Sequence, residues 1–119
     1  MKVIYSDKAR QLSDEYALLK RATDYLVNFV GPSAGLESAE WDRVDDKRSR
    51  RRYYTLKLSA FSRDVSDAFY PDELGQDAHM RFRLLGLWGS LLQANADVRL
   101  KKLQELVLEG TSGGQTDAR

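Results

Sequence analysis

Between residues 53 and 60 the chain alternates strictly between two sets of side chains, which is the pattern of a pleated strand. One set is apolar and the other is mixed: Tyr54, Leu56, Leu58 and Ala60 against Tyr53, Thr55, Lys57 and Ser59. This pattern is typical of a sheet that is covered on one face only. We expect this strand to be the centre of the sheet, followed by a turn at residues 62–64 and a shorter strand at residues 65–70.

Two segments carry the three- and four-residue spacing of amphipathic helices. The first runs over residues 7–30, where Gly31 and Pro32 end it. The second begins at Asp77 and continues to Glu109, where Gly110 ends it. Its predicted core positions share one arc of the helix: Met80, Leu84, Leu87, Trp88, Leu91 and Leu92.

These elements predict an α+β fold in the order αβββα, with a three-stranded antiparallel sheet and two helices packed on one of its faces. A further strand is expected near residues 39–45, joined to the central strand by a charged hairpin loop. Residues 3–5 fit either a short edge strand or an arm packed on the core. We expect one domain over residues 1–109 and a disordered tail over residues 110–119, which is polar and rich in glycine.

Composition narrows the function classes. The chain has 119 residues, no cysteine, and a net charge of +1 from 19 basic and 18 acidic side chains. The absence of cysteine excludes disulfides, thiolate metal sites and cysteine nucleophiles. No apolar run approaches the roughly 18 residues that span a bilayer. We therefore expect a soluble cytoplasmic protein without a membrane role.

A short basic run is the sharpest local feature of the sequence: Lys47, Arg48, Arg50, Arg51 and Arg52, followed at once by Tyr53. On a hairpin, these cations could contact nucleic-acid phosphates, and an exposed tyrosine could stack on an unpaired base. Two other interpretations stay open. The nearby Asp42, Asp45 and Asp46 could neutralise the run in cross-strand pairs, or the run could bind an acidic protein surface.

A second feature lies on the long helix, on the side away from its predicted core. Phe82, Gly86 and Gly89 project together there. Because an interior glycine costs a helix about 1 kcal/mol relative to alanine, two of them indicate that something approaches this face closely. The occupant could be the helix at residues 7–30, a second copy of the protein, or a ligand.

Catalytic and metal chemistry find little support in the sequence. His79 is the only histidine, so neither a usual zinc site nor a convincing Ser-His-Asp arrangement can be built. We expect no catalytic residue, no metal, no cofactor and no small-molecule ligand. The hypotheses that remain are a small binding module that contacts nucleic acid through residues 47–52, and a self-associating protein–protein module that uses the Phe82/Gly86/Gly89 face.

Overall fold

The computed structural model describes residues 1–31 and 35–114. In this part of the chain it shows an α+β fold with a four-stranded mixed sheet and three α-helices. The elements in chain order are β1 (Lys2–Tyr5), the short 3-10 helix η1 (Lys8–Arg10), α1 (Ser13–Val30), β2 (Leu36–Asp46), β3 (Arg51–Ala60), β4 (Arg63–Phe69), α2 (Pro71–Leu74) and α3 (Asp77–Gly114). The predicted fold class is therefore confirmed, and its details need correction.

The sheet has four strands in the order β1-β2-β3-β4, so the predicted three-stranded antiparallel sheet is wrong in part. The pairs β2–β3 and β3–β4 are antiparallel, as expected. The added strand β1 pairs parallel to β2, with Val3 opposite Ala39. This pairing is parallel because α1 carries the chain back between the two strands, as in other strand–helix–strand units. Residues 3–5 thus belong to an edge strand.

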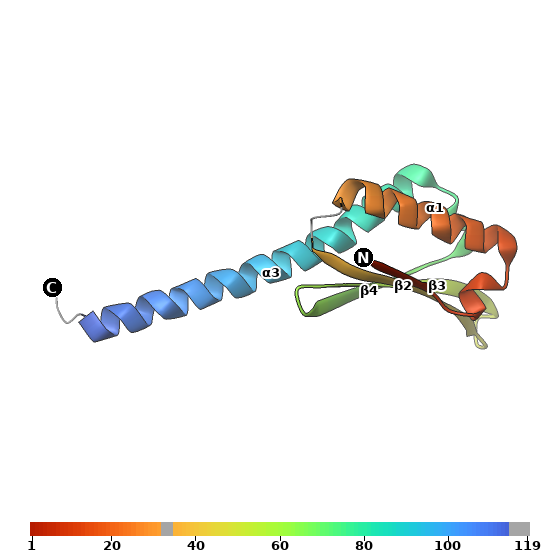
Figure 1. The fold of residues 1–119 in the computed structure, drawn as a ribbon. Helices are drawn as coiled ribbons and strands as arrows, with labels where there is room; N and C mark the ends of the chain where they lie inside the picture. The colour runs from red at the N-terminus through yellow and green to blue at the C-terminus, as the bar shows by residue number, and fades with distance from the viewer. Residues whose placement is uncertain (32–34, 115–119) are drawn as a thin grey trace.

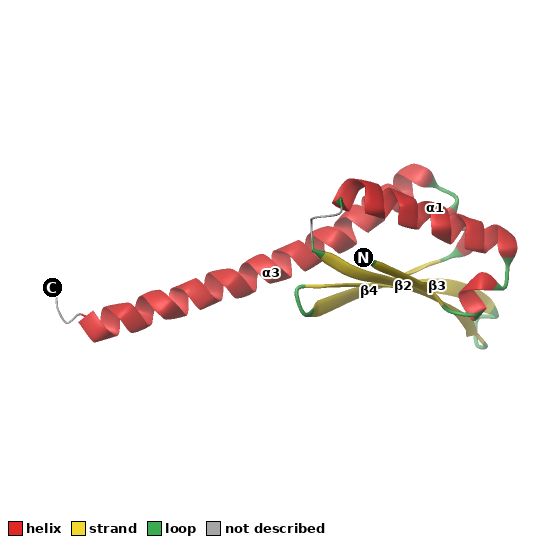
Figure 2. Cartoon of the chain, viewed as in Figure 1, coloured by secondary structure: helices red, strands yellow, loops and turns green. Residues whose placement is uncertain are grey.

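The core lies between the sheet and the helices, which cover one of its faces (Figure 2). The prediction for β3 is confirmed, because Tyr54, Leu56, Leu58 and Ala60 are each no more than 1% exposed. Trp41 of β2 is also buried and packs beside Phe69, with ring centroids 5.8 Å apart. Both predicted helices contribute to this core, α1 through Leu19, Ala22 and Leu26 and α3 through its predicted arc up to Leu91. The prediction that Leu92 belongs to the core is wrong, because its side chain is 43% exposed.

The first helix begins later than predicted. The chain forms the turn η1 first, and Leu12 is extended (φ −98°, ψ 104°), so α1 starts at Ser13 instead of residue 7. Ser6 caps the earlier turn, because its Oγ accepts a hydrogen bond from Ala9 N at 3.1 Å. The C-terminus is as predicted: Gly31 has φ +81°, and its N–H donates to the carbonyl oxygen of Val27 at 3.0 Å.

The turn between β3 and β4 lies one residue earlier than predicted. Phe61 and Ser62 have φ values of 56° and 62°, as a tight two-residue hairpin turn with positive φ requires. Arg63 and Asp64 therefore belong to β4. Phe61 folds back towards Gly35, where a Cβ atom would lie only 2.9 Å from the phenyl ring. Gly35 thus makes room for this ring.

The last helix is continuous from Asp77 to Gly114. It passes Gly110, where the sequence predicted its end. The predicted tail is described only to Gly114; residues 115–119 lie outside the described part. Beyond Leu91 the helix leaves the sheet and extends into solvent (Figure 1), giving the molecule extents of 67 × 34 × 24 Å.

Candidate functional site: the basic hairpin and the outer face of α3

The basic run lies on the β2–β3 hairpin, at the end of the molecule opposite the C-terminus of α3 (Figure 1). The acidic side chain of Asp46 shapes its turn. One carboxylate oxygen accepts Arg48 N at 3.0 Å, and the other accepts Ser49 Oγ at 2.9 Å. These bonds, the Ser49 bond first, hold the pKa of Asp46 below its ordinary value. Arg50 then takes φ 56° to bring the chain into β3.

The acidic neighbours do not neutralise the basic run. Asp42 accepts hydrogen bonds from Ser6 Oγ at 2.6 Å and from Arg43 N at 2.8 Å. Asp45 pairs with Arg43, whose Nε lies 3.1 Å from Asp45 Oδ1, and with Lys8 at 3.3 Å. The Arg43 hydrogen bond is the main cause that lowers the pKa of Asp45. All of these carboxylates therefore face partners outside residues 47–52, or form the turn itself.

Two of the five cations have defined partners. Arg52 donates to both carboxylate oxygens of Glu15 in α1: its Nε lies 2.8 Å from Oε1, and its Nη2 bonds to Oε2. Tyr54 OH donates to the same oxygen at 2.6 Å. The guanidinium of Arg51 lies over the ring of Tyr70, 3.8 Å from its centroid, and Tyr53 meets that ring edge-on at 6.2 Å. Tyr53 is thus half-buried against Tyr70 instead of standing free.

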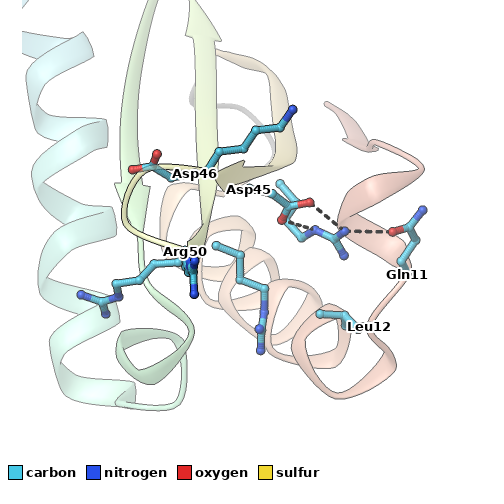
Figure 3. Close-up of a pocket in the computed structure, with 9 residues that line it drawn as sticks. Gln11, Leu12, Asp45, Asp46 and Arg50 are labelled. Atoms are coloured by element: carbon cyan, nitrogen blue, oxygen red, sulfur yellow. Dashed lines mark hydrogen bonds and ion pairs between the residues drawn. The ribbon is translucent and has the colours of Figure 1, made fainter.

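The other three cations, Lys47, Arg48 and Arg50, have exposed side chains without an ion pair in the described part of the chain. Lys47 and Arg50 line an open hollow of about 420 Å³ beside the segment that precedes α1 (Figure 3). The rest of its wall is Gln11, Leu12, Arg43, Asp45, Asp46, Arg51 and Arg52. The hollow therefore has more cationic than anionic side chains and could accept a phosphate.

The second predicted surface is exposed. Phe82 is 78% exposed, and a Cβ atom at Gly86 or Gly89 would meet nothing within 4 Å. The interpretation that α1 covers this face is therefore wrong. α1 instead meets the first turns of α3, where Arg21 pairs with Asp77 and Arg81 lies 4.4 Å from the centre of the Tyr25 ring.

The exposed face continues beyond the residues that the sequence singled out. Positions spaced alternately by four and three residues form one stripe along α3, and all are exposed: Phe82, Gly86, Gly89, Gln93, Ala96, Leu100 and Leu103. Leu85, Leu92 and Leu106 flank it and are 51%, 43% and 58% exposed. We call these ten residues the α3 stripe. The heptad spacing that adds Leu100 and Leu103 is present in the sequence, but the sequence analysis singled out only Phe82, Gly86 and Gly89 on this face.

The carboxylates near the start of α3 have structural partners. Arg83 binds Asp67 at 2.5 Å and Glu73 at 2.8 Å, and His79 Nε2 lies 3.0 Å from the same Glu73 oxygen. Burial opposes ionisation of Glu73, but bonds from Tyr70 N, His79 and Arg83 together hold its pKa below the ordinary value. Within residues 1–31 and 35–114, no group of three or more potential ligands is placed to hold a metal ion.

Comparison with known proteins gives no identification. No protein-family model matches the chain, and searches of curated proteins and of solved structures find no match. In the described part of the chain, no helix is both long enough and apolar enough to cross a bilayer.

Proposed function

We propose that the protein is a non-catalytic interaction module that self-associates through the α3 stripe. The observation that carries the proposal is the long helix itself. Its second half leaves the sheet, and Leu100 and Leu103 are 56% and 59% exposed on the same face as Phe82. An apolar stripe with alternating spacing of three and four residues is typical of helices that pack against another helix.

The size of the molecule supports the same proposal. Its radius of gyration is 19.6 Å, whereas a compact domain of this length would have about 13.5 Å. The difference comes from the second half of α3, where Val98, Leu100, Leu103 and Leu106 are each more than 40% exposed in the described part of the chain. Because tertiary packing supplies most of the stability of helices in proteins, a second helix against the stripe would stabilise this segment.

The test is the oligomeric state of the full chain at tens of micromolar by sedimentation equilibrium. The wild type should give about twice the chain mass of 13.6 kDa, and Leu100→Glu/Leu103→Glu should give the single-chain mass. Val98→Glu is the matched control, because Val98 is 41% exposed on the opposite side of the same segment. A wild type of single-chain mass at all concentrations would refute self-association.

A second candidate function is nucleic-acid binding through the β2–β3 hairpin. The exposed cations Lys47 and Arg50, which line the open hollow, and Arg48 on the same hairpin turn favour it. Binding should weaken steeply with salt, because each phosphate contact releases counterions. We expect Lys47, Arg48 and Arg50 to make the contacts with nucleic acid, because their side chains are exposed and carry no ion pair in the described part of the chain. Arg52 is held by Glu15, so its substitution would also disturb the fold.

Fluorescence anisotropy with a single-stranded oligonucleotide at several salt concentrations tests this candidate. Lys47→Ala/Arg48→Ala/Arg50→Ala should lower the slope of log K against log salt by about 2, at roughly 0.7 per contact with single strands. Arg99→Ala/Lys101→Ala/Lys102→Ala removes the same charge from α3 and should leave the slope near that of the wild type. An equal decrease of this slope in both variants would mean that binding depends on net charge alone and not on the hairpin.

A further inference from the structure

The α3 stripe has a distribution of side-chain sizes that selects one arrangement of two copies. Along the helix it reads large, small, small, polar, small, large, large: Phe82, Gly86, Gly89, Gln93, Ala96, Leu100 and Leu103. Gly86 and Gly89 lie on the part of α3 that packs on the sheet, and Leu100 and Leu103 lie on the part that extends into solvent. The two halves of the stripe are therefore complementary to each other in size.

We propose that two copies pair through α3 in antiparallel orientation, with Gly86 opposite Leu103, Gly89 opposite Leu100 and Gln93 opposite Ala96 of the second copy. The inference rests on the proposed self-association and adds its orientation and register. Each of these three layers then combines one larger and one smaller side chain, so the two helices can keep a constant separation across them. The extended end of each α3 covers the glycine face of the other copy.

The flanking positions fit the same register. Leu85 meets Leu106 of the second copy, and both side chains are more than half exposed in the single chain. On the other flank Ser90 meets Asp97, and both are exposed in the single chain. None of these pairs brings like charges together, which would oppose association.

A parallel pairing fits poorly. It would place Gly86 against Gly86 and Gly89 against Gly89 at one end, and Leu100 against Leu100 and Leu103 against Leu103 at the other. Helices close enough to fill the glycine layers would clash at the leucine layers, and helices spaced for leucine would leave voids at the glycines. The opposite face of α3 is occupied by the core through Leu84, Leu87 and Leu91, so the sheet does not obstruct the stripe.

Engineered cysteines distinguish the arrangements, because the chain has no cysteine of its own. Gly86→Cys and Leu103→Cys are prepared separately, each on an exposed position, then mixed and oxidised. In the antiparallel register the two thiols face each other, so the mixture should form a covalent dimer while each variant alone should not. Mixing Gly86→Cys with Glu105→Cys is the control, because Glu105 is exposed on the far side of the helix from the stripe.

The yield of covalent dimer from the mixture of Gly86→Cys and Leu103→Cys should be at least about tenfold higher than from the control mixture. The reason is that a disulfide needs Cα atoms within roughly 7 Å. Efficient dimerisation of Gly86→Cys alone would overturn the antiparallel register while leaving self-association intact. No dimer in any mixture, from a wild type that sediments as a single chain, would overturn both. No dimer from a wild type that sediments as a pair would overturn the register only.

Discussion

At the residue scale, Thr23 joins three elements of the core through one hydroxyl group. Its Oγ accepts hydrogen bonds from Trp41 Nε1 at 2.8 Å and from Tyr5 OH at 3.2 Å, and it donates to the Leu19 carbonyl oxygen at 2.8 Å. Thr23 is the buried polar residue of α1, with 5% of its surface exposed. The indole N–H of a buried tryptophan thus depends on a single acceptor from the helix above it.

Thr23→Val should destabilise the protein by about 1–3 kcal/mol, because it leaves the Trp41 N–H buried without an acceptor while keeping nearly the same volume. Thr23→Ser keeps the hydroxyl and removes one methyl group, so it should cost about 1 kcal/mol. Urea unfolding followed by tryptophan fluorescence measures both. A valine variant as stable as the wild type would show that this hydrogen bond contributes nothing to folding.

At the element scale, Glu15 fixes α1 to β3. Its side chain is 13% exposed, and it accepts hydrogen bonds from Arg52 and Tyr54. Against the effect of burial, these bonds, led by that of Arg52, lower the pKa of Glu15 from 4.5. The same carboxylate, together with burial, raises the pKa of Tyr54 to about 12.

A lowered pKa in the folded state gives a definite pH dependence. The stabilisation by ionised Glu15 is complete above its unfolded value of 4.5 and is lost as the pH falls through the lower folded value. Glu15→Gln should therefore cost about 1–2 kcal/mol at pH 7 and progressively less below pH 4.5. Unfolding free energies of the two proteins between pH 7 and pH 3 should converge on acidification.

Asp14→Asn is the control for this experiment. Asp14 is exposed in the same turn of α1 and has no ion pair in the described part of the chain. The unfolding free energy of Asp14→Asn should therefore depend on pH in nearly the same way as that of the wild type. If the unfolding free energies of wild type and Glu15→Gln differed by the same amount at every pH, the charge of Glu15 would not contribute to stability.

Sequence periodicity predicted the elements well where one pattern decided the structure. Tyr54, Leu56 and Leu58 alternate so strictly that only one face of β3 could be buried, and they are buried. The edge strand β1 was left open, because four residues carry too little pattern to separate a strand from an arm. The start of α1 was misplaced because η1 and the extended Leu12 depend on tertiary contacts that local propensity does not contain.

The candidate site was predicted less completely. The sequence correctly placed Phe82, Gly86 and Gly89 away from the core. It did not extend this face to Leu100 and Leu103, because residue types alone do not show where the helix passes the edge of the sheet. The pairing of Arg52 with Glu15, 37 residues apart in the chain, could not be read from residue types alone.

At the scale of the whole molecule, the β2–β3 hairpin lies far from the free half of the α3 stripe. The β2–β3 hairpin and the free end of α3 are at opposite ends of the long axis (Figure 1), and the molecule is 67 Å long. A contact on one surface therefore leaves the other accessible. Binding at the hairpin and pairing through α3 are independent proposals. Sedimentation can refute the pairing while anisotropy still supports nucleic-acid binding, and the reverse also holds.

The outward position of the hairpin also determines what an antiparallel pair would present to solution. The two hairpins would lie at the distal poles of a rod, each facing away from the centre. A short anionic strand could occupy one pole only, whereas a strand long enough to span the rod could engage both. The gain in avidity would then depend on strand length, because the distance between the two hairpins sets the shortest strand that can bind both.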